Sequence, residues 1–467
     1  MKKLILVFFF GIWAFLIPSV AQTGGDSFLK ALNNINEDVL KAQLGFLASD
    51  WMEGRATATR GDYMASDYIA SQLRLFGVAP AGDLPADKST AGLFDSSENT
   101  YFQNFTLIKT IPGEPPVMKI IVSEGKDHIR TTNPQPDTDF FVYGQRQSVE
   151  MEAPVVFVGY GIRNEKLRID DFSNLDLRGK LVLRIAGSPG FLEDKLSVAE
   201  MLYLSRDAER IARQAGAAGM ITFDPSAAVP VPPRRNPFPD IAYAEASQSP
   251  GRRSASYSLP STKSPDSFIS ILVSARTADE LFSGTGFNVE EFVSNSVKKH
   301  VKPITLPADR KIYIKTNVKT ENVRVRNVVG IIKGKDTSQI IVLGAHYDHM
   351  GMSDGYVWNG ADDNGSGTVA VLEAARVLSP FEFDYTIRFI AFDEEEIGLV
   401  GSYVYAQRAK QQERTILGVL NLDMIAWDSD NDFEYSIATN NISQAFTNDF
   451  IRTTAYYQPQ LNHNFYY

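Results

Sequence analysis

Short apolar runs alternate with amphipathic segments in the last third of the chain. The apolar runs predict strands at 323–332, 339–344, 385–392 and 417–422, and helical spacing predicts helices at 365–378 and 401–411. Alternating strands and helices indicate an α/β fold, with a largely parallel mixed sheet sandwiched by helices. Ligands of such sheets bind outside the carboxyl ends of the strands.

The pattern differs earlier in the chain. Residues 26–48 and the second half of 47–78 have helical spacing, whereas 113–300 contains short strands and turns with one helical stretch at 199–218. A Pro-, Ser- and Arg-rich part, 227–264, is a predicted surface loop or lid. We therefore predict a β-rich inserted domain at 113–300. The flanking parts, 22–112 and 301–467, are predicted to form the catalytic domain together.

The amino terminus has the three parts of a signal peptide. Lys2 and Lys3 precede an apolar run at 4–17, and Ser19-Val20-Ala21 is a small-x-small cleavage site. The run is short for a membrane span, which needs about 20 apolar residues. Residues 1–21 are thus a predicted signal peptide, and the protein is predicted to be exported to the periplasm or the medium without stable membrane insertion.

Composition limits the possible partners and metal ligands of the protein. The 467 residues carry a net charge of −10, which argues against nucleic acid as a partner. There is no cysteine, so disulfides and thiolate ligands are excluded. Any bound metal must therefore be held by carboxylates and by some of the five histidines.

Potential ligands follow three of the predicted strands. His346 and Asp348 come after the first strand, the acidic run 393–396 after the second and Asp423 after the third, while Asp362 lies in a Gly-rich loop. Each feature alone also suits a turn, a helix cap or a solvated surface. Carboxyl ends of parallel strands meet at one edge of a sheet, however, and one histidine with several carboxylates suits zinc.

Four motifs resemble the co-catalytic zinc aminopeptidases, metallopeptidases of clan MH. They are His-Tyr-Asp at 346–348, Gly-Ala-Asp-Asp-Asn-Gly-Ser-Gly at 360–367, Glu-Glu-Ile-Gly-Leu at 395–399 and Asn-Leu-Asp-Met at 421–424. This family holds secreted bacterial leucine aminopeptidases and, more distantly, glutamate carboxypeptidase. Within the insertion, 153–162, 175–180 and 212–223 resemble a protease-associated (PA) domain.

The resemblance implies a role for each site residue. Asp362 would bridge two zinc ions and form a cis peptide with Asp363. His346 and Asp423 would complete one zinc site, and Glu396 would bind the other zinc. Glu395 would be the general base. The carboxylate of Asp348 would orient His346.

One family feature is not found. The second zinc of the family takes a further histidine from a Ser-Asp-His motif, which does not occur here, and the surroundings of His463 do not match it. We therefore expect a carboxyl-terminal truncation. The predicted function is an exported zinc metallopeptidase that acts on the amino terminus of peptides. A carboxypeptidase or glutaminyl cyclase on the same scaffold, or a non-catalytic peptidase-like binding protein, are the alternatives.

Overall fold

The structure is a computed structural model of the chain. It describes residues 31–84, 99–123, 128–192, 195–196, 198–227, 255–260, 267–353, 355–426, 434–440, 443–457 and 462–466. The predicted signal peptide, and the predicted loop 227–264 apart from residues 227 and 255–260, lie outside the described residues. None of the helices in the described part has the length and apolar character that a membrane span requires.

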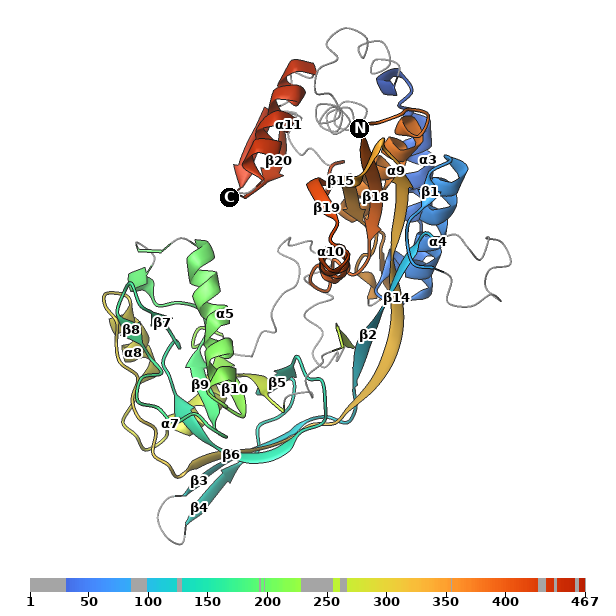
Figure 1. Cartoon of the computed structure of the whole chain (residues 1–467). Coiled ribbons are helices and arrows are strands. Elements are labelled where there is room, and N and C mark those ends of the chain that lie inside the picture. Colours follow the sequence, from blue (N-terminus) through green and yellow to red (C-terminus); the bar gives the residue numbers. More distant parts are fainter. Residues whose placement is uncertain are drawn as a thin grey trace. The chain divides into compact units, whose positions relative to one another are not determined.

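Two compact units divide the chain. Unit 1 comprises Met1–Leu107 and Val323–Tyr467, and unit 2 is Ile108–Asn322. The chain leaves unit 1 within β2 (Phe102–Pro112) and returns within β14 (Val318–Ile332) (Figure 1). The structure thus places 301–322 in unit 2 rather than with the catalytic part.

A mixed sheet forms the centre of unit 1. Its order is β2, β14, β18 (Tyr385–Phe392), β15 (Asp336–His346) and β19 (Thr415–Asn421), and β1 (Ala79–Pro80) pairs with β14. β15 is parallel to both β18 and β19, whereas β14 is antiparallel to β18. The predicted α/β class is confirmed. The carboxyl ends of β18, β15 and β19 lie at one edge.

Helices cover both faces of this sheet. Alternate residues of β15 point to opposite faces, so Ile341 and Leu343 pack in one core while Ile340 and Val342 pack in another. The larger core includes residues of α3 (Glu37–Leu47), α4 (Arg60–Leu75) and α9 (Gly367–Leu378). The smaller one includes Tyr405 of α10 (Val400–Gln411) (Figure 1). Burial on both faces explains the continuous apolar runs of the strands.

Unit 2 contains an eight-stranded sheet. Its order is β4 (Ile129–Thr132), β3 (Val117–Ser123), β13 (Arg310–Lys315), β6 (Glu150–Phe157), β9 (Leu181–Ile185), β10 (Gly219–Phe223), β12 (Ile269–Val273) and β5 (Phe140–Tyr143). β6, β9, β10 and β12 are parallel, and their buried apolar residues pack with helices α5 (Val198–Gln214), α7 (Ala275–Phe282) and α8 (Val289–Ser296). The assignment of this unit to the PA domains stays a prediction.

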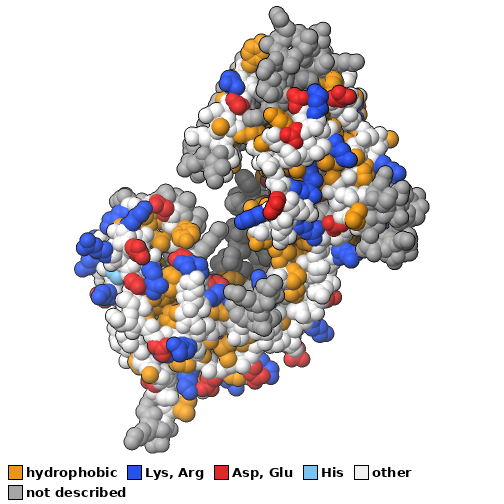
Figure 2. All heavy atoms as spheres, viewed as in Figure 1, with side chains coloured by type: hydrophobic (Ala, Val, Ile, Leu, Met, Phe, Trp, Pro, Cys, Tyr) orange, Lys and Arg blue, Asp and Glu red, His pale blue; other side chains and the backbone are white. Residues whose placement is uncertain are grey.

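Shorter elements complete the described part. Two hairpins join β7 (Arg163–Asn164) to β8 (Ile169–Asp170) and β16 (Gly351–Ser353) to β17 (Tyr356–Trp358), and β11 (Ser256–Ser258) pairs with β2. Near the carboxyl terminus β20 (Glu434–Ala438) pairs with β21 (Asn462–Tyr466), with α11 (Gln444–Tyr457) between them in sequence. The His463 side chain lies outside the described residues. Charged and apolar side chains are intermingled on the face of each unit that Figure 2 shows.

Candidate metal centre

The ends of three parallel strands carry the candidate ligands. β15 ends at His346, which is in register with Phe392, the last residue of β18. The acidic run 393–396 follows directly, and Asp423 comes two residues after the end of β19. Because the three strands are parallel neighbours, their following residues come together at one sheet edge, as the sequence predicted.

The first group consists of His346, Asp363 and Asp423. The imidazole Nε2 of His346 is 3.2 Å from Asp363 Oδ1 and 3.5 Å from Asp423 Oδ1. Burial alone would lower the pKa of His346, but hydrogen bonds to the neighbouring carboxylates raise it well above its usual value. A buried imidazole surrounded by carboxylates suits a cation at this point.

The second group consists of His349, Asp363 and Glu396. His349 Nδ1 is 2.7 Å from Glu396 Oε1 and 4.0 Å from Asp363 Oδ2. Asp363 therefore belongs to both groups and offers one oxygen to each. Within each group the potential ligand atoms lie within 4.8 Å of one another. Burial raises the pKa of Asp363, but its histidine neighbours and Arg55 outweigh burial, and this pKa lies below its usual value.

His349 was not assigned a role from the sequence. It follows Asp348 directly, at a position where the family resemblance gave no ligand. The ring packs against Gly360, where a Cβ atom would come within 2.6 Å of ring carbons, and Gly360 has a positive φ of 58°. A glycine is therefore required beside this histidine. The available signal was the spacing His-x-x-His just beyond a buried strand.

Asp362 is not part of either group. Its carboxylate Oδ1 accepts a hydrogen bond from the backbone N–H of Ala426 at 2.8 Å. The predicted cis peptide between Asp362 and Asp363 is wrong, because the cis bond joins Asp363 to Asn364. Consecutive side chains point in different directions, so the backbone of this turn decides which aspartate faces the histidines.

Both groups fit zinc by the chemistry of their donors. Each offers one imidazole nitrogen and two carboxylates, and the nitrogen and oxygen ligands of zinc are of these kinds. The shared carboxylate matches a two-metal site, in which a single residue holds both ions. The candidate centre therefore uses His346, His349, Asp363, Glu396 and Asp423.

Sequence comparisons cover the part of the chain that contains these residues. The sequence model of Peptidase family M28 matches residues 327–466. This chain carries an M28 peptidase domain. Aminopeptidase YwaD of Bacillus subtilis is 43% identical over 108 residues, which are 22% of this chain and 23% of that protein. Aminopeptidase Y of Saccharomyces cerevisiae is 32% identical over 145 residues, 31% of this chain and 26% of that protein.

Matches to these curated relatives span about a quarter of their length. Solved structures resembling this chain include an aminopeptidase from Aneurinibacillus sp. strain AM-1, with 20% identity and a TM-score of 0.48. That match covers 88% of this chain and 75% of the other. The zinc aminopeptidase BSAP from Bacillus subtilis has 19% identity and a TM-score of 0.44, over 92% and 80% of the two chains.

Asp348 of the M28 domain fixes the backbone of the acidic run. Its two carboxylate oxygens accept hydrogen bonds from the N–H groups of Glu395 and Glu396, at 3.0 and 3.1 Å. His346 Nδ1 lies 3.2 Å from the backbone oxygen of Asp348 and 3.5 Å from its carboxylate. The resemblance implied that this carboxylate orients His346. Its hydrogen bonds show that it positions the backbone of Glu395 and Glu396 at least as directly.

Glu395 stands beside the first group. Its Oε2 atom is 3.9 Å from His346 Nε2. Burial is the main cause that raises the pKa of Glu395 to about 7, with nearby carboxylates adding to the effect and His346 opposing it. A carboxylate with a pKa in this range can both accept and return a proton near neutral pH.

Arg55 lies in a polar stretch of the sequence, yet the structure buries its side chain. The residue ends the short helix η1 (Asp50–Arg55), and its guanidinium donates to the backbone oxygens of Leu47, Tyr347, Asn359 and Gly360. Its own backbone oxygen accepts from the His349 N–H at 3.0 Å. One side chain thus ties η1 to both loops that carry the histidines and Asp363.

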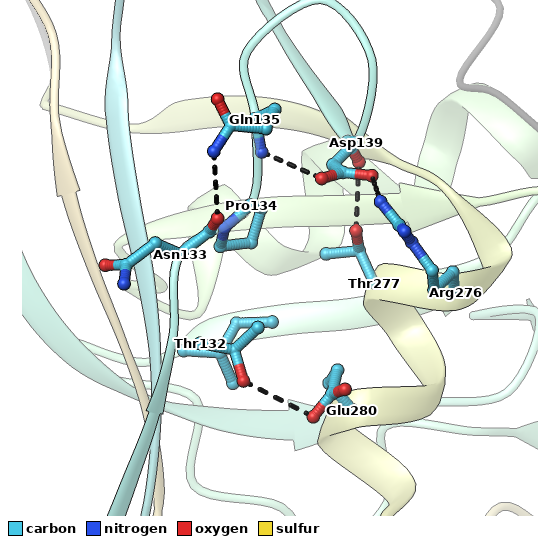
Figure 3. A pocket seen from close by; sticks show the side chains of 9 residues that line it. Thr132, Asn133, Pro134, Gln135, Asp139, Arg276, Thr277 and Glu280 are labelled. Carbon is cyan, nitrogen blue, oxygen red and sulfur yellow. Dashed lines mark hydrogen bonds and ion pairs between the residues drawn. The ribbon is translucent and has the colours of Figure 1, made fainter.

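The pocket drawn in Figure 3 lies elsewhere, in unit 2. It has a volume of about 300 Å³ and includes the ion pair of Asp139 with Arg276 and the hydrogen bond of Thr132 with Glu280. No group of three potential metal ligands lies in it among the described residues. The groups of potential metal ligands found among the described residues all lie in unit 1.

Replacing Arg55 by lysine should destabilise the M28 domain. One ammonium cannot reach four carbonyls, and each buried carbonyl left unpaired costs about 1–3 kcal/mol. We expect Arg55→Lys to lower the free energy of unfolding by about 2–5 kcal/mol. Urea unfolding followed by tryptophan fluorescence measures this, since unit 2, Ile108–Asn322, contains no tryptophan and the described tryptophans Trp51 and Trp358 belong to unit 1.

The control is Arg60→Lys at an exposed position, which should change stability by less than about 0.5 kcal/mol. Equal stability of the two variants would contradict the role given to Arg55.

Asp363 and Asp362 form a matched pair for the metal centre. Asp363→Asn should lose zinc from both positions, because it removes the carboxylate common to the two groups. Asp362→Asn should keep zinc, because an amide oxygen can still accept from Ala426. Zinc per chain after dialysis, measured by mass spectrometry, decides between them. If Asp362→Asn loses zinc and Asp363→Asn keeps it, Asp362 rather than Asp363 is the bridging residue.

Proposed function

We propose that this chain is the metal-binding part of a zinc aminopeptidase, which hydrolyses the first peptide bond of peptides. The observation that carries the proposal is the pair of ligand groups that share Asp363. Relatives of the M28 domain are named aminopeptidases, which favours action at the amino terminus. The signal peptide predicted at 1–21 supports export of the enzyme.

The proposed ligands are His346, Asp363 and Asp423 for one zinc ion and His349, Asp363 and Glu396 for the other. Zinc held there would supply Lewis acidity that polarises the peptide carbonyl and makes water more acidic. The sequence reasoning gave Asp362 in place of Asp363 and no role to His349. The remaining ligands are those that it gave.

Glu395 is proposed as the general base. Its Oε2 atom takes a proton from the attacking water and later gives it to the leaving amine. Asp348 supports this step by accepting the N–H of Glu395, which holds the base beside the first group. Partial burial matters too, because it raises the pKa of Glu395 toward neutrality.

The test is release of p-nitroaniline from leucine p-nitroanilide by the zinc-loaded chain, expressed with any sequence that follows Tyr467 in the gene. We expect release from the free amine and none from the N-acetylated substrate. Glu395→Gln should keep its zinc and lose activity by about 10²–10⁴-fold, since it removes the proton acceptor and leaves the ligands intact.

Three outcomes would redirect the proposal. Cleavage only of substrates with a free carboxyl terminus would indicate a carboxypeptidase, and cyclisation of amino-terminal glutamine would indicate a glutaminyl cyclase. Zinc-loaded protein without any of these activities would indicate a peptidase-like binding protein.

A further inference from the structure

Unit 1 contains a third group of potential ligands, separate from the two at the metal centre. Asp62 of α4 lies beside Asp393 and Glu394, which follow β18, and one oxygen of each lies within 4.8 Å of the others. The three residues are 1%, 0% and 0% exposed. Three carboxylates in such a place need compensation for their charge, because burying an unpaired charge is costly.

No basic side chain provides that compensation. Among the residues that the structure describes, no ion pair joins a Lys, Arg or His to Asp62, Asp393 or Glu394. The Tyr347 hydroxyl lies close enough to Asp62 to oppose the rise of its pKa, but the hydrogen bond that it donates goes to the backbone oxygen of Arg326. The hydrogen bonds that the group accepts come from Ala58 N–H, Arg326 N–H, Glu394 N–H and Thr57 Oγ1.

Two oxygens of the group have no hydrogen-bond partner. They are Asp62 Oδ1 and Glu394 Oε1, each with almost no exposed surface. Buried polar atoms without partners are uncommon, and a bound ion is one of the usual reasons. Glu394 also has a φ of 63°, in the left-handed region that residues other than glycine rarely adopt. The fold thus keeps a buried acid where the backbone favours glycine.

We propose that Asp62, Asp393 and Glu394 bind a hard divalent cation, Ca²⁺, as a third metal site behind the catalytic centre. Oxygens bound to one Ca²⁺ at 2.3–2.6 Å lie at most about 5 Å apart, and one oxygen of each of these residues lies within 4.8 Å of the others. The donors are oxygens only, unlike the two histidine-containing groups, and hard cations prefer oxygen. Mg²⁺ keeps several waters, whereas this group is almost fully enclosed.

Position in the chain gives this cation a function. Asp393 and Glu394 directly precede Glu395, and Asp62 belongs to a helix from the other end of the sequence. A cation between them fastens α4 to the segment that carries the base. The Ca²⁺ site itself does not require the proposed aminopeptidase activity. Only the claim that the cation helps to hold a general base, Glu395, rests on that proposed function.

Protons are the competing occupants. Burial is the main cause that raises the pKa of Asp62 to about 7 and that of Glu394 to about 9. Without a cation the group is therefore at least partly protonated at neutral pH. Metal content separates the two cases.

The experiment uses the full chain, unfolded in urea with chelator and refolded with Zn²⁺ and Ca²⁺, because a buried site loads during folding. After gel filtration, mass spectrometry of metals should find one Ca²⁺ per wild-type chain. Glu394→Gln, which has the same shape without the charge, should lose Ca²⁺ and keep zinc. Glu382→Gln, at an exposed position near the start of β18, should keep both.

Two further measurements keep the result decisive. Asp423→Asn should lose zinc and keep Ca²⁺, because Asp423 belongs to the zinc centre alone. The Ca²⁺ proposal can therefore be judged even if the catalytic proposal fails. Ca²⁺ should also raise the unfolding temperature of the wild type and leave that of Glu394→Gln unchanged; Asp62→Asn replaces that variant if it does not fold. Wild-type protein without bound Ca²⁺, and with an unfolding temperature that Ca²⁺ does not change, would overturn the proposal in favour of protons.

Discussion

The carboxylate of Asp363 presents its two oxygens in two directions, toward His346 and toward His349. The surrounding structure serves to keep it there. Gly360 allows the chain to turn with a positive φ and leaves room for the His349 ring. Arg55 fixes the flanking backbone through four carbonyl groups. A small displacement of this loop would separate the two groups, because they share only this residue.

Electrostatic repulsion is the main difficulty of such a centre. The loop after β18 brings four consecutive acids to a partly buried sheet edge, beside Asp348, and burial raises the pKa of Glu395 and of Glu394. Cations at two histidine-containing groups, and at the proposed oxygen-only group behind them, would relieve this repulsion. On this account, metal binding stabilises the domain as well as supplying chemistry.

The architecture of unit 1 was predictable because its strands are buried on both faces. The run predicted as a strand at 385–392 is β18, and the predicted convergence of three strand ends follows from their parallel order. The choice between Asp362 and Asp363 was not predictable in this way, since adjacent residues share a sequence pattern and differ only in backbone direction. Arg55 was missed for another reason. Charged residues in polar stretches are usually solvated, and their burial depends on contacts with distant segments.

The central claim is that one carboxylate, that of Asp363, joins two metal positions that each contain a histidine. A crystal structure of zinc-loaded protein, with anomalous diffraction measured above and below the zinc absorption edge, tests it most directly. The account predicts two zinc peaks, one beside His346 and one beside His349, with Asp363 bound to both. A single peak, or two peaks bridged by Asp362, would contradict it.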